Sequence, residues 1–112
     1  MNGAGLVTAV TSAAGVITID CSSQSRLRTI TLTENVTSWS FTNLPAAGAF
    51  VDVSVRITQH ASSAKTVVSP ATSGRTAGGA WTQSETLGDI ETLGLRVYSD
   101  GTVDLFPSGV FG

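Results

Sequence analysis

The fold of this chain is decided by one stretch, Phe50-Val51-Asp52-Val53-Ser54-Val55-Arg56-Ile57-Thr58-Gln59. Apolar and polar residues alternate along it, and side chains on a β-strand point to opposite faces with a period of two. The stretch therefore predicts a strand with one apolar face and one polar face. At about 3.3 Å per residue it would span roughly 30 Å, so we expect the rest of the chain to cover the apolar face.

The flanking sequence repeats this alternation in shorter segments. Further strands are expected over residues 6–10, 16–20, 26–33, 37–42, 65–69, 90–98 and 102–106. Asp100-Gly101 is a strong two-residue hairpin signal between the last two, and Pro107 is expected to end the final strand. No helical period occurs, so the sequence predicts an all-β fold: a single antiparallel β-sandwich or jelly-roll-like domain of seven or eight short strands.

The chain of 112 residues corresponds to one domain. Residues 1–12 are expected to form an N-terminal arm or edge strand, and residues 107–112 an apolar C-terminal tail. The N-terminus carries no basic region ahead of an apolar run, so no signal peptide is expected. No apolar run approaches the ~20 residues of a membrane span. The single cysteine, Cys21, cannot form an internal disulfide and is expected to be a small semi-buried apolar residue.

Charged residues are scarce in this sequence. They make up 12% of the chain, against about 25% in an ordinary soluble domain, and thirty serine and threonine residues supply most of the polar surface. Two interpretations remain open: much of the surface is covered in an assembly, or the chain is simply a neutral, Thr-rich β-protein. The net charge of −2 leaves no basic face, which disfavours nucleic acid as a partner.

No set of residues carries a catalytic signature. His60 lies at a strand end, and no G-x-S-x-G elbow presents a serine to it, so it is interpreted as a polar strand-end residue. One cysteine and one histidine cannot make a structural zinc site within one chain. Glu85, Asp89 and Glu91 form the one acidic cluster, which could bind calcium, but a solvated rim fits their spacing better. We therefore expect no enzymatic activity, no metal and no cofactor.

Residues 71–87 form the longest stretch without a clear period, and such loops are often functional in a compact domain. Arg75 and Trp81 lie in it and are candidate partner contacts. Trp81 could stack on a sugar ring or anchor an interface. Alternatively, it folds back as a lid over one open edge of the sandwich.

Four further residues are candidate contacts with a partner. Val110 and Phe111 lie in the apolar tail, which is free to drape over another protein. Asp52 and Arg56, on the polar face of the deciding strand, either face solvent or pair across a subunit boundary. By contrast, Trp39 and Phe41 share one face of a strand and are expected to lie in the core.

Several segments resemble, in order, a pattern that recurs in virion proteins of tailed bacteriophages. They are Ile17 to Asp20, Thr31 to Pro45, Gly48, Val51 to Gln59, Thr66 to Pro70, Gly78-Gly79-Ala80-Trp81, Asp100-Gly101-Thr102 and Leu105 to Phe111. The resemblance covers most of the chain from Val16 onward. It implies a small β-sandwich knob, often trimeric, on capsid surfaces or at the tips of tail and head fibres, with no catalytic residues. Fibre domains of this kind usually follow a long repetitive shaft, which is not present here.

We therefore expect a non-enzymatic virion structural protein. Its most specific form is a capsid decoration or cement protein, made in the host bacterial cytoplasm, that binds the major capsid shell as a homotrimer. It would add buried area across capsomer boundaries, so that opening the capsid must also break its contacts. The alternative is a fibre-tip or receptor-binding module that recognises a surface glycan through the Gly-rich loop around Trp81. Neither function requires nucleic acid, a membrane or a cofactor.

Overall fold

The computed structural model describes residues 6–22, 25–72, 75–76 and 81–111 of the chain. These residues form strands and irregular segments, and no helix occurs among them, so the all-β prediction is confirmed. The strands are β1 (Leu6–Ala9), β2 (Val16–Asp20), β3 (Ser25–Thr31), β4 (Ser38–Thr42), β5 (Phe50–Thr58), β6 (Ile90–Tyr98) and β7 (Val103–Phe111).

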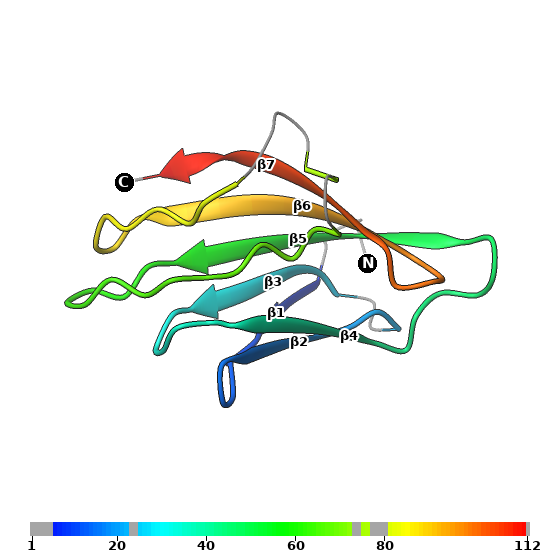
Figure 1. Cartoon of the computed structure of the whole chain (residues 1–112), viewed down its shortest axis with the longest axis horizontal. Coiled ribbons are helices and arrows are strands. Elements are labelled where there is room, and N and C mark those ends of the chain that lie inside the picture. Colours follow the sequence, from blue (N-terminus) through cyan, green and yellow to red (C-terminus); the bar gives the residue numbers. More distant parts are fainter. Residues whose placement is uncertain (1–5, 23–24, 73–74, 77–80, 112) are drawn as a thin grey trace.

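The strands form a five-stranded sheet in the order β1-β3-β5-β6-β7 and a two-stranded sheet of β2 and β4 (Figure 1). From β1 to β5 the chain changes sheet with every strand, so neighbouring strands of one sheet run in the same direction. The pairs β1–β3, β3–β5 and β2–β4 are parallel, whereas β5–β6 and β6–β7 are antiparallel. The expected antiparallel arrangement is therefore wrong for the N-terminal half, because an alternating pattern reads the same in both directions and does not encode strand polarity.

The strand β5 lies at the centre of the five-stranded sheet, and its two faces differ as its alternation predicts. Val53, Val55 and Ile57 are buried, whereas Asp52 and Arg56 on the opposite face are exposed. Since β3 and β6 pair with its two edges, the backbone of β5 has a partner on both sides.

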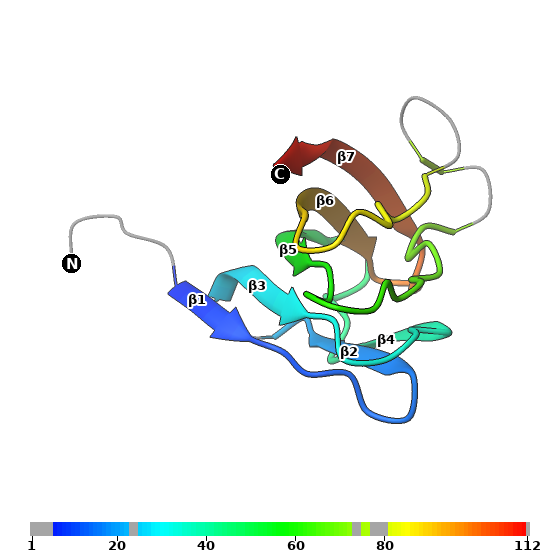
Figure 2. The ribbon, with the colours of Figure 1, turned by 90° about the vertical axis from the view of Figure 1, so that its left-hand side faces the viewer.

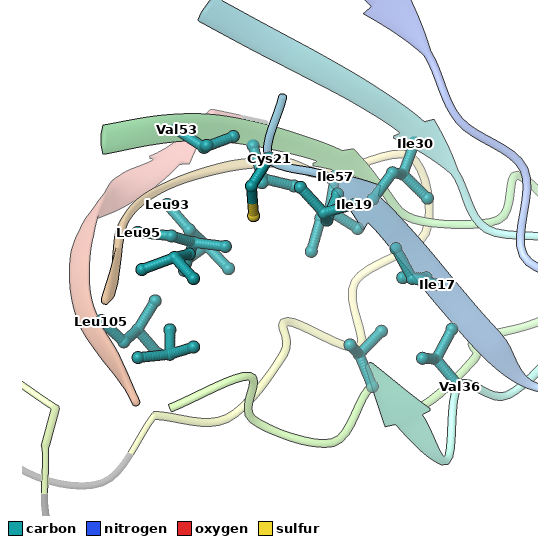
Figure 3. Packing of buried hydrophobic residues seen from close by; sticks show 14 of the residues in the cluster. Ile17, Ile19, Cys21, Ile30, Val36, Val53, Ile57, Leu93, Leu95 and Leu105 are labelled. Atoms are coloured by element: carbon teal, nitrogen blue, oxygen red, sulfur yellow. The ribbon is translucent and has the colours of Figure 1, made fainter. Parts of the chain in front are cut away.

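One hydrophobic core joins the two sheets. Ile17 and Ile19 of β2 are fully buried and pack in a single cluster with the inward side chains of β3, β5, β6 and β7 (Figure 3). Trp39 and Phe41 of β4 are only partly buried at the margin of this cluster. These two residues were expected in the core, and the structure places them at its rim. The reason is that β4 pairs with β2 alone and lies beside the core.

Residues 65–69 do not form the expected strand. Val67 makes one isolated parallel bridge with Val36, in which Val36 N donates to Thr66 O at 2.8 Å and Val68 N donates to Val36 O at 3.0 Å. On the N-terminal side, the backbone of Lys65 is bound by the side chain of Gln59. The segment is therefore held by backbone bonds to Val36 and by side-chain bonds to Gln59, and it closes one side of the core without joining a sheet.

The hairpin between β6 and β7 has a loop of three residues, Ser99 to Gly101, where two were expected. Tyr98 N donates to Thr102 O at 2.9 Å, and Gly101 adopts a φ of 86°. A three-residue hairpin loop needs this left-handed residue at its last position, and glycine adopts it without a steric penalty.

The strand β7 continues through Pro107 to Phe111, so the expected C-terminal tail is largely part of the sheet. Proline cannot donate a hydrogen bond to a neighbouring strand, but β7 is an edge strand. In addition, the register shifts next to Pro107: Leu93 pairs with Pro107, and Thr92 pairs with Gly109. An edge position beside a bulge accommodates the proline, which is why it does not end the strand.

One face of the five-stranded sheet is open. Figure 2 views the strands nearly end-on, and the β2–β4 sheet and residues 59–71 and 81–89 of the connection from β5 to β6 lie on the core side. Within the described part of the chain, no element covers the opposite face, which we call the outer face.

Candidate interaction surface on the outer face

The outer face carries apolar, hydroxyl and charged side chains side by side. Its most exposed large apolar residues are Val7 on β1, Phe50 on β5 and Phe106 on β7, which are 63%, 50% and 45% exposed. A shallow hollow lies over Gly94, where the missing side chain leaves space between Ser54 and Phe106. These three residues lie on strands that are not neighbours in the sheet, so they are separate exposed apolar residues and not one contiguous patch.

Asp52 and Arg96 form an ion pair across β5 and β6, where the two residues stand opposite each other in the register. Arg96 Nε donates to Asp52 Oδ1 at 2.8 Å, and Nη2 donates to Oδ2 at 3.3 Å. The guanidinium also lies 4.4 Å from the centre of the Phe50 ring, within the range of a cation–π contact. Asp52 thus has an ionic partner within its own chain.

Tyr98 connects the Asp52–Arg96–Phe50 group to a second group that contains Arg75 and Asp104. The Tyr98 hydroxyl donates to Asp104 Oδ2 at 2.7 Å, and Arg75 Nε donates to Asp104 Oδ1. The hydroxyl bond and the Arg75 guanidinium hold the pKa of Asp104 below its ordinary value. The Tyr98 ring lies 5.4 Å from the Arg75 guanidinium carbon and 6.1 Å from the Phe50 ring centre. We call these six residues the charge–aromatic cluster: Phe50, Asp52, Arg75, Arg96, Tyr98 and Asp104.

Arg75 reaches this cluster because its segment runs along the free edge of β7. Leu105 N donates to Arg75 O at 3.0 Å, and Thr72 N donates to Val103 O at 3.0 Å. Thr76 forms a parallel bridge with Leu105. The segment therefore protects the first half of this edge in the way that an additional strand would.

Arg56 does not join the cluster. It is exposed, stands opposite Thr92 on β6, and makes no ion pair with any residue in the described ranges. Of the two residues considered for a pair across a subunit boundary, Asp52 is therefore already engaged and only Arg56 has its charge available. The sequence placed Arg96 and Tyr98 on one face of a strand, but it did not indicate that this strand is the neighbour of β5.

Trp81 folds back onto the core. Its ring is partly buried against the apolar cluster, and its Nε1 donates to Glu91 Oε2 at 2.6 Å. Glu91 is buried, so the expected solvated rim is wrong for this residue, whereas Glu85 is exposed as expected. Ser84 N donates to Glu91 Oε1 at 2.8 Å, so the carboxylate ties the loop to β6.

The candidate contact residues of the expected C-terminal tail belong to the last strand. Val110 and Phe111 pair with Glu91 and Ile90 in β7, and their side chains lie outside the described part. Their backbone is therefore held in the sheet and is not a free tail. The Gly78-Gly79 pair and residues 1–5 of the expected arm also lie outside the described ranges.

The single histidine of the chain, His60, takes part in a turn. His60 Nδ1 accepts hydrogen bonds from Ser62 N at 3.1 Å and Ser63 N at 3.0 Å, so this nitrogen holds a turn. No group of three or more His, Cys, Asp or Glu side chains in this part of the chain could hold a metal ion. A search of the same residues for a helix long and apolar enough to cross a membrane found none.

Comparisons of the chain with protein-family models, with curated proteins and with solved structures returned no match.

Proposed function

We propose that this chain is a non-enzymatic virion structural protein with a β-sandwich fold. In its most specific form it is a capsid decoration protein that binds the major capsid shell as a homotrimer on the virion surface, after synthesis in the host bacterial cytoplasm. The observation that carries the proposal is the uncovered outer face of the five-stranded sheet. The sequence resemblance to bacteriophage virion proteins supplies the class of assembly.

The parallel part of the sheet argues that a partner covers this face. All-parallel sheets occur almost only where both faces are covered, whereas antiparallel sheets tolerate water on one side, and in this mixed sheet the comparison concerns the three parallel strands alone. Here β1, β3 and β5 are mutually parallel, and only one of their faces is covered within the described chain. Val7 at 63% and Phe50 at 50% exposure add apolar area that association would remove from water.

The charges of the outer face are compatible with burial in an interface. Moving an unpaired charge out of water is strongly unfavourable, whereas a charge with a good partner loses much less. Asp52 is paired with Arg96, and Arg75 is paired with Asp104. Most of the ionic groups on this face could therefore be covered without leaving a charge unsatisfied, which suits a scarcely charged chain that is built into an assembly.

The alternative glycan-binding function through Trp81 has less support. The indole Nε1 is occupied by Glu91, and the ring packs on the core. A tryptophan in this position stabilises the loop in the way that a lid would, so we do not place a sugar-binding face there.

Light scattering coupled to size-exclusion chromatography tests the oligomer. The wild type is expected to elute with three times the 11.4 kDa mass of one chain. Ser54→Arg puts a long cation on the outer face of β5, and we expect it to weaken the trimer. Thr18→Arg, on the exposed side of β2, is the matched control and should leave the trimer intact. A monomeric wild type at micromolar concentration would sink the proposal.

Co-sedimentation with capsid shells of the phage that encodes the chain tests the partner. Saturable binding of the wild type that is lost in Ser54→Arg and kept in Thr18→Arg would support decoration. Co-purification with a tail or fibre fraction and no binding to shells would instead favour the fibre-tip alternative.

A further inference from the structure

A hollow beside β4 has the features of a binding site, and it is separate from the outer face. It lies between β4 and residues 68–72, close to the hairpin residue Gly101. Its volume of about 350 Å³ falls within the range of about 300–1,000 Å³ found for small-molecule sites. It is open to solvent, so a chain-like ligand could extend beyond it in either direction.

Two aromatic rings line this hollow. Trp39 and Phe41 stand two residues apart on β4, so both side chains leave the same face of the strand. Their ring planes are parallel to within 7°, and the ring centres are 6.3 Å apart. Trp39 Nε1 donates to Val68 O at 2.7 Å, which fixes the indole in place. The pair therefore offers a pre-ordered aromatic surface that does not have to rearrange before a ligand binds.

The remaining lining is polar but uncharged. Thr37, Ser69 and Thr72 line the hollow, where Ser69 Oγ accepts a bond from Ala71 N and Thr72 Oγ1 accepts one from Val103 N. None of the described lining residues carries a charge. A charged ligand would lose its hydration here and gain no opposite charge in return. A neutral ligand with both apolar and hydroxyl faces fits this lining better.

We propose that this hollow binds a neutral carbohydrate, as an internal segment of an oligosaccharide or polysaccharide. The C–H face of a sugar ring packs on aromatic rings, while its hydroxyls exchange hydrogen bonds with serine and threonine. The inference uses neither the Trp81 loop nor the proposed oligomer, so it stands or falls independently of the proposed function. It differs from the alternative set aside above in its residues and its place in the fold.

Tryptophan fluorescence titrations test this site directly. The wild-type chain and the less stable Trp81→Phe variant, in which Trp39 is the sole tryptophan, are both titrated with cellotetraose, maltotetraose and mannotetraose, with trigalacturonic acid as the charged comparator. We expect at least one neutral sugar to give a saturable change in Trp39 emission and the acidic sugar to give none. Phe41→Ala, in either background, should weaken binding about tenfold, because one ring of the aromatic surface is lost.

A second variant tests the site if Phe41→Ala does not fold. Val68 lines the hollow and is 44% exposed, so Val68→Glu puts a charge into the neutral lining and leaves the core intact. Leu87→Glu, at a position that is 48% exposed and away from the hollow, is the matched control. Loss of binding in Val68→Glu alone supports the site. Absence of binding by every neutral sugar at millimolar concentration, or equal binding by Val68→Glu and Leu87→Glu, would overturn it.

Discussion

Trp81 Nε1 donates a hydrogen bond of 2.6 Å to Oε2 of Glu91, a carboxylate that is only 4% exposed on the core side of β6. The other oxygen of Glu91 accepts a bond from Ser84 N at 2.8 Å. A buried carboxylate is tolerated where hydrogen-bond donors surround it, and here both donors come from the loop that precedes β6. The pair therefore decides how this loop closes the core.

Trp81→Phe should destabilise the protein, because it keeps an aromatic ring and removes the donor. A buried acceptor that loses its partner costs about 1–3 kcal/mol, so the free energy of unfolding should fall by that amount. Urea denaturation followed by circular dichroism measures it. Leu87→Ala, at an exposed position of the same loop, is the control and should change the midpoint little. An unchanged midpoint in Trp81→Phe would show that the bond contributes nothing to stability.

Gln59→Met should be strongly destabilising although it preserves the size of the side chain. The Gln59 amide is 1% exposed and binds at both ends: Nε2 donates to Lys65 O and Ser84 O, and Oε1 accepts from His60 N and Lys65 N. Each backbone group left unpaired costs about 1–3 kcal/mol. Thermal unfolding should show a large drop in Tm.

The matched control for that change is Gln83→Met. Gln83 is also buried, but its Oε1 has no partner among the described residues and its Nε2 makes one long bond of 3.4 Å to Ser84 O. Replacement of a poorly satisfied amide should be close to neutral. Equal losses of Tm in Gln59→Met and Gln83→Met would contradict the role given to Gln59.

Gly15→Ala and Gly94→Ala should shift stability in opposite directions. Gly15 has a φ of +78°, and an added Cβ would lie 2.9 Å from Thr37 Oγ1. The left-handed backbone alone costs about 1–2 kcal/mol for a residue with a Cβ. An alanine at Gly94 would meet Phe106 only at the ordinary contact distances of 3.5 and 3.6 Å. Alanine is also preferred over glycine within a strand by about 0.5–1 kcal/mol, so the Tm of the Gly94→Ala variant should rise. A stabilised Gly15→Ala variant would refute the assigned turn.

Asp104 should contribute to the loss of stability in acid. Its pKa is lowered by the Tyr98 hydroxyl and by Arg75, so the ionised form is favoured in the folded state. The resulting stabilisation is present above the ordinary pKa of 3.8 and is lost as the pH falls through the lower folded value. Tm measured at a series of pH values should therefore fall less steeply in Asp104→Asn than in the wild type. An equally steep fall of Tm in Asp104→Asn and in the wild type would contradict this role of Asp104.

Much of the strand content could be predicted because it follows from local alternation. Residues 90–98 were expected to form a strand, and β6 spans Ile90–Tyr98 with Leu93, Leu95 and Val97 buried on one face. Residues 65–69 pair with a neighbour at one residue only, through the bridge between Val67 and Val36, and do not form a strand. Propensity indicates that a segment can be extended, whereas a strand also needs a partner whose position is set by the rest of the fold.

Two residues of the charge–aromatic cluster were named from the sequence as candidate partner contacts, and that role stays a prediction. Asp52 and Arg75 were singled out, and the structure connects both to one charge–aromatic cluster. Their partners Arg96, Tyr98 and Asp104 were missed as partners, because pairing across strands depends on which strands are neighbours and in what register. Glu91 was expected at a solvated rim, and the structure buries it. Its burial depends on donors from a loop that carries no periodic signal, so the sequence did not indicate it.

The sequence by itself determined which segments extend and which of their faces is apolar, since side chains alternate with a period of two in any strand. The tertiary structure decided the direction of β3 and β5, the passage of β7 through Pro107 and the ion pair between Asp52 and Arg96. These features arise from contacts between residues far apart in the chain. For the stretch at residues 50–58, alternation alone predicted two faces, and the arrangement of the neighbouring strands decided which of them no element covers in the described part of the chain.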